Sequence, residues 1–190
     1  MNLPLAIPEA ITTSRLELRC FRTGDLDSLG RLQRSPGIAR YLYWDPPDDE
    51  ELVARLERRL GDTVVAIDGD RLSWAVTTHA DESLVADVTM ILTSVEHCQL
   101  EIGYTVHPDH QRRGYATEAA RALIDFGFGV VGAHRIVGRI DARNHASAAV
   151  LEHAGMRREA HLRENELVKG TWTDEEIYAV LFDEWRTSDR

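Results

Sequence analysis

Residues 107–132 read HPDHQRRGYATEAARALIDFGFGVVG, and this stretch holds two glycine patterns that resemble phosphate-binding loops. Gly127, Gly129 and Gly132 have the G-x-G-x-x-G spacing, whereas residues 111–116 spell Q-R-R-G-Y-A. Between them, apolar residues of 115–126 recur at helical spacing and predict a helix. The question is therefore whether a phosphate would bind at the start of this helix or at its end.

The polarity of the predicted helix separates the two patterns. Gly127, Gly129 and Gly132 come after the helix, where the dipole is negative and the free backbone groups are carbonyls. We interpret them as C-cap glycines that allow positive φ, and not as a nucleotide site. Residues 111–116 instead follow a predicted strand and precede the helix, so free N–H groups face a bound anion.

The start of the helix has the other features of an anion site. Gly114 lets a phosphate approach the backbone, Ala116 keeps the first turn open, and Thr117 adds a hydroxyl group. Arg112 and Arg113 add local positive charge to a chain whose net charge is −10. The alternative is a plain strand-to-helix turn with solvated arginines.

Outward from this stretch, short apolar runs alternate with turn signals. Strands are predicted at 15–21, at 63–67, 72–77, 85–92 and 100–106 in an antiparallel meander, and at 135–141, 156–164 and 175–185. Helices are predicted at 23–34, 49–60, 115–126 and 144–155. We interpret the chain as one α+β domain with a mostly antiparallel sheet.

Length and composition limit the protein class. A chain of 190 residues suits one core, and the acidic balance argues against general nucleic-acid binding. Cys20 and Cys98 form no metal-spaced pair, and we expect free thiols in a reducing compartment. The N-terminus lacks a secretion signal and no apolar run approaches transmembrane length, so we expect a cytoplasmic protein without a membrane partner.

Four blocks, in this order, resemble the GCN5-related N-acetyltransferases (GNAT), and most closely the branch that includes the ribosomal-protein N-terminal acetyltransferases. The blocks are TSRLELR, EIGYTVHPDHQRRGYATEA, NHASAAVLEHAGM and GTWTDEEIYAVLFDEW. The resemblance implies one N-acetyltransferase domain over residues 1–190, with a core of about 13–185. It also implies a mixed, mostly antiparallel sheet whose central strands splay apart between flanking helices.

The resemblance further implies transfer of an acetyl group from acetyl-CoA to a primary amine, without a metal. In that family the Q/R-x-x-G-x-G/A pattern binds the pyrophosphate of coenzyme A, the pantetheine arm lies along the splayed strand, and an Asn and a Ser approach the arm and its sulfur. The residues that we expect to bind the coenzyme are Tyr104, Thr105, Val106, Gln111, Arg112, Arg113, Gly114, Tyr115, Ala116, Thr117, Asn144 and Ser147.

Two residues are candidates for catalysis. Glu101 begins the splayed strand and is the candidate base, because the early residues of this strand face the acceptor in members of the family. The alternative is that Glu101 is an exposed or salt-bridged strand residue. Ser147 is the candidate hydrogen-bond donor to the departing thiolate, and it is also a natural first-turn residue after the N-cap Asn144. His107 and His110 flank Pro108 without a third ligand in register, so we expect no metal there.

The acceptor is expected to be a cationic amine, either a protein N-terminus or a small molecule. Candidate contacts are the aromatic residues Tyr41, Tyr43, Trp44 and Trp172, which can also be explained as packing at a helix joint. A homodimer is compatible with the sequence. Two other functions stay open: an acyl-CoA-binding or sensing protein without turnover, and a nicotinamide-dependent oxidoreductase that would rest only on the G-x-G-x-x-G spacing.

Overall fold

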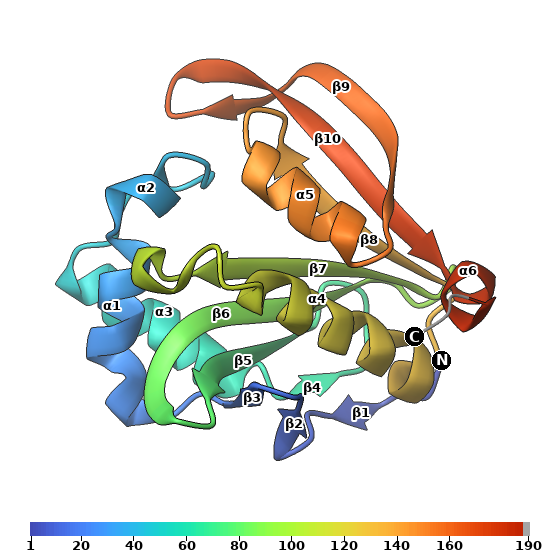
Figure 1. Ribbon diagram of the computed structural model, residues 1–190, viewed down its shortest axis with the longest axis horizontal. Coiled ribbons are helices and arrows are strands. Elements are labelled where there is room, and N and C mark those ends of the chain that lie inside the picture. The colour runs from blue at the N-terminus through green and yellow to red at the C-terminus, as the bar shows by residue number, and fades with distance from the viewer. Residues whose placement is uncertain (188–190) are drawn as a thin grey trace.

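A mixed eight-stranded sheet organises the protein (Figure 1). The computed structural model describes residues 1–187. The strand order is β2-β3-β5-β6-β7-β8-β10-β9, and every neighbouring pair is antiparallel except β7 and β8, which run parallel. The strands are β2 (Ala10–Thr12), β3 (Leu16–Cys20), β5 (Arg71–Thr78), β6 (Asp81–Ser94), β7 (Gln99–Val106), β8 (Arg135–Asp141), β9 (Arg157–Val168) and β10 (Thr171–Leu181). The predicted α+β class and the antiparallel meander are confirmed.

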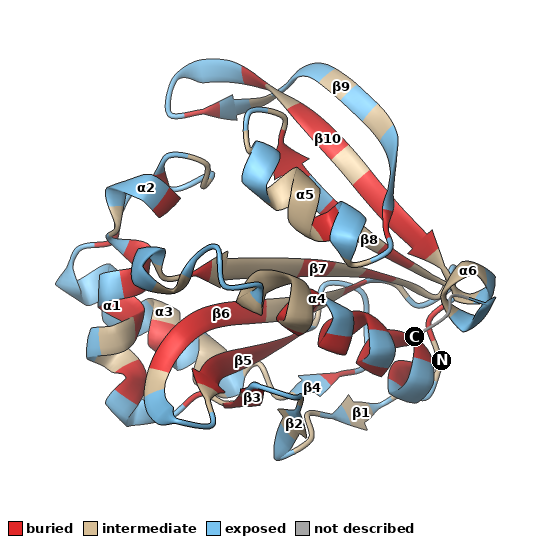
Figure 2. Cartoon of the chain, in the orientation of Figure 1, coloured by how far each residue is buried: buried red, intermediate tan, exposed pale blue. Residues whose placement is uncertain are grey.

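Helices cover both faces of this sheet. They are α1 (Leu26–Gln33), which follows a 3₁₀ turn at Thr23–Asp25, α2 (Pro36–Ala39), α3 (Asp49–Gly61), α4 (Tyr115–Phe126), α5 (His145–His153) and α6 (Phe182–Thr187). α4 buries Ala119, Ala120 and Leu123 in the main core, while α1 and α3 bury leucines in a second core on the opposite face. Figure 2 shows the buried stripe of α4 turned toward the strands and its outer side exposed.

The predicted strand at 63–67 is much shorter than expected. β4 (Val64–Val65) pairs with β1 (Leu5–Ala6) in a separate two-stranded sheet. The carboxylate of Asp70 accepts hydrogen bonds from the backbone N–H groups of Ala66 (2.8 Å) and Ile67 (2.9 Å). These bonds turn the chain directly after β4, and so the strand ends there.

The central strands β7 and β8 diverge. They pair only over Gln99–Glu101 and Arg135–Val137. Beyond Glu101, β7 remains paired with β6 as far as Val106, and β8 remains paired with β10 as far as Asp141. Figure 1 shows the two strands separating from their common end near α6. The edge of β7 that faces β8 is therefore left without a strand partner after Glu101, in agreement with the predicted splay.

The C-terminal prediction is wrong in two places. The predicted strand at 175–185 ends at Leu181, which pairs with Arg135, the first residue of β8; the chain has no further strand residue to pair with and continues as α6. The strand predicted at 156–164 extends to Val168. A tight turn at Lys169 and Gly170, both with positive φ, joins β9 to β10.

The glycines after α4 differ from the C-cap interpretation. The helix continues through a π-helical turn at Gly127–Val131 and ends at Gly132, which has a φ of +77°. A Cβ at Gly127 would lie 2.7 Å from Cδ1 of Ile136, so this position requires glycine for close packing. Only the last of the three glycines supplies the positive φ that was expected of all of them.

Two further predictions concern the cysteines and membrane-spanning helices. Cys20 and Cys98 are both free thiols, as predicted. In the part of the chain that the structure describes, no helix is long and apolar enough to cross a membrane.

Candidate active site

The predicted phosphate loop, residues 111–116, lies between the end of β7 and the start of α4. Gly114 is the N-cap of α4 with a φ of +79°, and Arg112 also has a left-handed φ of +59°. The first N–H groups of a helix have no acceptor within the helix, and Gly114 has no side chain that could cap them. The side chain of Gln111 donates to the carbonyl of Val106 (3.1 Å), which ties the loop to the strand.

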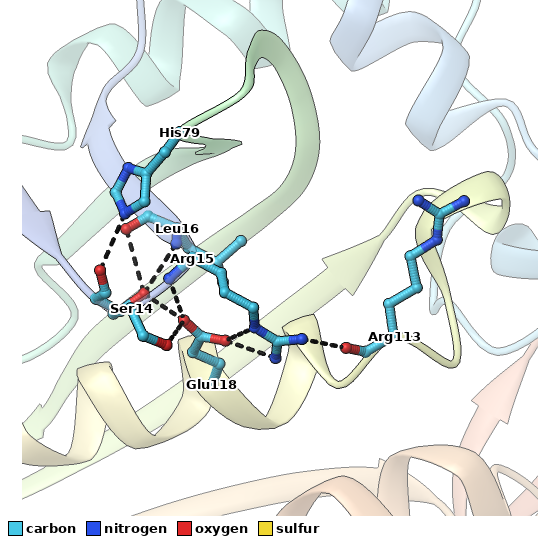
Figure 3. A network of polar contacts seen from close by, with 7 residues as sticks. Ser14, Arg15, Leu16, His79, Arg113 and Glu118 are labelled. Carbon is cyan, nitrogen blue, oxygen red and sulfur yellow. Dashed lines mark hydrogen bonds and ion pairs between the residues drawn. The ribbon is translucent and has the colours of Figure 1, made fainter.

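A cluster of hydrogen bonds around Glu118 holds this loop from behind (Figure 3). Oε1 of Glu118 accepts hydrogen bonds from the hydroxyl groups of Thr13 (2.6 Å) and Ser14 (3.0 Å) and from the backbone N–H of Arg15 (2.9 Å). The Arg15 guanidinium group donates to Oε2 of Glu118 (2.6 Å) and to the carbonyl of Arg113 (2.8 Å). Arg15 therefore binds the carbonyl side of the loop and leaves the N–H side to a ligand.

Neither Arg15 nor Glu118 was predicted as a site residue. Burial by itself would raise the pKa of Glu118, but the hydrogen bonds from Thr13, Arg15 and Ser14 outweigh it and hold the pKa below its usual range. Both residues occur in the blocks TSRLELR and YATEA. An acidic residue in the first turn of the predicted helix was the available signal.

The loop fits a diphosphate on physical grounds. It combines free backbone N–H groups, the positive end of α4 and the exposed residues Arg112 and Arg113. A Cβ at Gly114 would lie 3.2 Å from Nη2 of Arg15, so a side chain there would press on the guanidinium group that holds the loop. The unpaired edge of β7 begins at Glu101 and runs toward this loop, which suits an extended amide-containing chain such as pantetheine.

Asn144 and Ser147 lie where β8 meets α5. The side chain of Asn144 accepts a hydrogen bond from the N–H of Ser147 (3.1 Å), so Asn144 is the N-cap of α5. The phenol oxygen of Tyr104 lies 2.8 Å from the hydroxyl oxygen of Ser147 and 2.9 Å from its carbonyl oxygen. The structure thus connects the diverging strand β7 to the start of α5 through two hydroxyl groups.

A separate pocket of about 240 Å³ opens on the other face of β7. We call it the carboxylate pocket; its lining residues are Tyr43, Glu101, Arg139, Glu166 and Glu175. Glu101 alternates with the buried residues Leu100 and Ile102, which face the main core, so its side chain points to this opposite face. Burial raises the pKa of Glu101; Arg139 lowers it and Glu175 raises it further.

Arg139 and Glu175 form the fixed part of the carboxylate pocket. The guanidinium group of Arg139 donates to both carboxylate oxygens of Glu175, at 3.0 and 2.7 Å. Glu175 also accepts from the hydroxyl of Tyr43 (3.3 Å) and from the side chain of Asn165 (3.0 Å). Glu166 lies 3.7 Å from Arg139. Since Glu175 balances Arg139, the carboxylates of Glu101 and Glu166 give the pocket a negative excess.

Of the four predicted aromatic contacts, Tyr43 lines this pocket. The ring of Tyr41 lies under the guanidinium of Arg40 at 5.0 Å, and that of Trp44 lies under Arg55 at 5.4 Å. Trp172 lies within β10 and is 58% exposed, opposite Leu167 on β9. The structure therefore does not bring Tyr41, Trp44 and Trp172 into the pocket with Tyr43.

Arg139 and Glu175 were not predicted as site residues. Both occur inside strand patterns, where a charged residue is usually taken to face solvent. The alternation of Arg135 and Arg139 with the apolar residues of β8 indicates that both arginines lie on one face of the strand. This alternation does not show which strand supplies the partner of Arg139.

A wider groove of about 1310 Å³ lies between residues 8–15 and the outer face of α4. It borders Gly114 but includes no residue of β7, so it is distinct from the carboxylate pocket.

The rings of His107 and His110 lie 5.9 Å apart. Among residues 1–187, no group of three or more His, Cys, Asp or Glu side chains is arranged to hold a metal ion.

The sequence of this chain is similar to a known protein family and to several known proteins. The family described as "Acetyltransferase (GNAT) domain" matches residues 15–157. The uncharacterized N-acetyltransferase YnaD of Bacillus subtilis is 29% identical over 92% of this chain and 98% of its own length. Spermidine N(1)-acetyltransferase of Vibrio cholerae is 25% identical over 88% of this chain and 94% of its own length.

Solved structures have the same fold. A GNAT-family acetyltransferase from Bacillus anthracis has a TM-score of 0.82 at 26% identity, covering 92% of this chain and 99% of its own. The spermidine N-acetyltransferase of Vibrio cholerae, in complex with CoA and spermine, has a TM-score of 0.78 at 22% identity, covering 92% and 100%.

Proposed function

The chain belongs to the GNAT acetyltransferases and is an acetyl-CoA-dependent N-acetyltransferase, and from that premise we propose which of its residues act. The phosphate loop holds the diphosphate of the coenzyme through its backbone N–H groups, with Arg112 and Arg113 adding positive charge. The unpaired backbone edge at Tyr104, Thr105 and Val106 pairs with the pantetheine amides, and Asn144 lies beside the arm. The chain works as one domain over residues 1–190, with a core of about 13–185.

Glu101 is the proposed general base. The observation that supports this most strongly is that the pairing of β7 with β8 ends at Glu101. The carboxylate pocket and the unpaired edge of β7 therefore meet at one residue, where an amine on one face can reach a thioester on the edge. The raised pKa of Glu101 makes it a stronger base than an exposed carboxylate once it has lost its proton.

The transfer step follows from these positions. Glu101 takes the proton that the amine loses as its nitrogen forms the C–N bond with the acetyl carbonyl carbon. The C–S bond breaks and the sulfur leaves with its electron pair, while the Ser147 hydroxyl donates a hydrogen bond to it. A serine hydroxyl is too weak an acid for more than this hydrogen bond to be required.

For the acceptor, a small polycationic amine is proposed ahead of a protein N-terminus. Glu101 and Glu166 give the carboxylate pocket a negative excess that suits a charged amine. Two relatives with related sequences are named as spermidine acetyltransferases. A primary amine of lysine type, with a pKa of about 10.4, also needs a base more than an α-amine with a pKa of about 7.7–8.0.

An amine panel tests this assignment. The protein is mixed with acetyl-CoA and with spermidine, a monoamine, or a peptide that carries the free α-amine of a ribosomal-protein N-terminus, and the release of free thiol is followed. We expect turnover with spermidine above that with the monoamine. Preference for the peptide would support the ribosomal branch instead, and tight acetyl-CoA binding without thiol release from any amine would favour the non-catalytic binding protein.

Matched variants identify the base. Glu101→Gln is expected to lower kcat by about 10²- to 10⁴-fold, the usual contribution of a general base. Glu166→Gln, in the same pocket, is expected to raise the KM for the amine while kcat changes little. Equal kcat values for wild type and Glu101→Gln would remove Glu101 from the mechanism.

A further inference from the structure

The contact between Tyr104 and Ser147 provides more hydrogen-bonding capacity than a structural tie between β7 and α5 requires. The phenol oxygen of Tyr104 is within hydrogen-bond distance of both the hydroxyl oxygen (2.8 Å) and the carbonyl oxygen (2.9 Å) of Ser147. A single hydrogen bond from the phenol to the carbonyl would hold the two elements together. The second oxygen contact requires an explanation.

Two proton arrangements satisfy these distances. In one, the Tyr104 phenol donates to the Ser147 carbonyl, and the Ser147 hydroxyl donates to the phenol oxygen. In the other, the phenol donates to the Ser147 hydroxyl oxygen, and the serine proton is free to point elsewhere. The arrangements differ only by rotation of two hydroxyl groups, because each group has one proton and accepts others.

We propose that Tyr104 is a positioning residue for acetyl transfer: it donates to the Ser147 hydroxyl oxygen and so directs the serine proton toward the departing sulfur. This inference rests on the proposed function, which places Ser147 beside that sulfur. When negative charge develops on the sulfur, the second proton arrangement is favoured. Tyr104 then donates in the contact in which Ser147 had donated, so the hydrogen bond between the two oxygens is kept while the serine proton turns to the sulfur.

The surroundings of Tyr104 suit this role. Burial raises the pKa of its phenol, with a smaller contribution from Tyr178, whereas the hydrogen bond with Ser147 lowers it. The phenol therefore keeps its proton at any pH at which the enzyme would work. Asn144 fixes the backbone of Ser147 from the other side, since it accepts the N–H of Ser147 at 3.1 Å. Tyr104 and Asn144 thus hold the same residue, one at its hydroxyl group and the other at its backbone N–H.

The test measures the ionisation of the coenzyme A thiol in its binary complex, which needs neither an acceptor amine nor turnover. Ultraviolet absorbance of the thiolate is followed against pH for wild type, Ser147→Ala, Tyr104→Phe and the double variant. In wild type we expect the bound thiol to ionise at lower pH than free coenzyme A. Ser147→Ala should raise that pH by about 1 unit, the value of one hydrogen bond to a charged group.

Tyr104→Phe should raise the same midpoint by about half as much, because the serine hydroxyl remains but is no longer directed. The double variant should match Ser147→Ala, because Tyr104 acts through Ser147. Tyr178→Phe is the control: it removes a different phenol, which is buried and donates to Glu176 (3.1 Å), and should leave the thiol midpoint at the wild-type value. Melting temperatures confirm that each variant is folded.

The outcomes separate this inference from the proposed function. A midpoint that moves in Ser147→Ala but not in Tyr104→Phe would overturn the role of Tyr104 and leave Ser147 beside the sulfur. A midpoint unchanged in both variants would remove Ser147 from the sulfur and overturn the inference with it. If Tyr104→Phe does not fold, 3-fluorotyrosine at position 104 replaces it; a more acidic phenol should lower the midpoint, and an unchanged midpoint contradicts the proposal.

Discussion

At the scale of single residues, the site depends on where carboxylates are buried and what they contact. Glu118 and Glu101 illustrate the two cases. Glu118 accepts four hydrogen bonds, and these outweigh burial and lower its pKa. Glu101 is half-buried where the unpaired edge of β7 begins, and the burial of its carboxylate raises its pKa. The first arrangement stabilises the fold, and the second prepares a base.

The raised pKa of Glu101 predicts a trade between stability and activity. Its carboxylate holds a proton more tightly in the folded state than in the unfolded state, so it lowers the free energy of unfolding near neutral pH, where the unfolded chain has lost that proton. Glu101→Gln should therefore be more stable than wild type at neutral pH, and the difference should vanish as the pH falls below the unfolded pKa of about 4.3.

Denaturant unfolding at several pH values measures this difference, and pH–rate profiles measure its functional counterpart. Wild-type kcat should rise as the pH increases through the pKa of Glu101, and that step should be absent in Glu101→Gln. If Glu101→Gln were less stable than wild type at neutral pH, the ionised Glu101 would be stabilised by a favourable ion pair and not disfavoured by burial.

Gly114 combines a backbone requirement with a binding requirement. Gly114→Ala should destabilise the fold by about 1–2 kcal/mol, because alanine disfavours the left-handed φ of +79°. It should also weaken coenzyme A binding, because a methyl group would press on the Arg15 guanidinium group and shift the loop that it holds. Gly69→Ala, at another positive φ with open space around it, carries the same backbone strain and should leave the affinity unchanged. Calorimetric titration distinguishes the two effects.

At the scale of elements, α4 is fixed at both ends by contacts that its own sequence does not reveal. At the start, residues 13–15 bind Glu118 and the loop carbonyl (Figure 3). At the end, a π-helical turn brings Gly127 against β8. The helix itself was predicted at 115–126 because its alanine-rich periodicity is local, whereas both end contacts involve residues far away in the sequence.

The attachment of residues 13–15 predicts a pH-dependent stability. Glu118→Gln should lower the free energy of unfolding at neutral pH by about 1–3 kcal/mol, because several donors lose a charged acceptor. The stability that wild type gains from Glu118 should be lost as the pH falls through the lowered pKa of Glu118. Glu57→Gln, on the exposed side of α3, should change stability by less than about 0.5 kcal/mol. Equal losses in both variants would contradict the role of Glu118.

The two glycines of the π-helical turn should respond in opposite directions. Gly127→Ala should destabilise the protein by about 1–3 kcal/mol, since its Cβ would lie 2.7 Å from Ile136 and 3.1 Å from Leu100. Gly129→Ala meets nothing within 4 Å and should stabilise by up to about 1 kcal/mol through helix propensity. Thermal unfolding of the pair checks this. Equal effects would show that the turn is not packed as described.

At the scale of the whole molecule, the sequence predicted the strand-to-helix loop but not the carboxylate pocket. The loop is one continuous segment with its own polarity, so residues 111–116 could be assigned from order alone. The pocket joins distant segments: Tyr43 and Glu175, which form a hydrogen bond, are 132 residues apart. Arg139 and Glu175 meet because β8 pairs with Glu175–Leu181 of β10 in a register that places Arg139 opposite Ile177, two residues along the strand from Glu175.

The end of β10 also depends on pairing with a distant segment, which the local sequence does not show. The apolar pattern at 175–185 is consistent with a strand to its last residue. The strand stops at Leu181 because its partner β8 begins at Arg135, a fact about pairing and not about local propensity. The sheet thereby places the phosphate loop and the carboxylate pocket at two ends of one unpaired strand edge, within a chain whose net charge is −10.

The central claim is that the start of α4, and not the glycines at its end, binds the diphosphate. A nuclear magnetic resonance titration of the ¹⁵N-labelled protein with coenzyme A tests it most directly, because each backbone amide reports separately. The largest shifts should occur at the amides of residues 112–117, while those of residues 127–132 stay unchanged. Shifts concentrated at 127–132, or none at 112–117 under saturating coenzyme A, would contradict the claim.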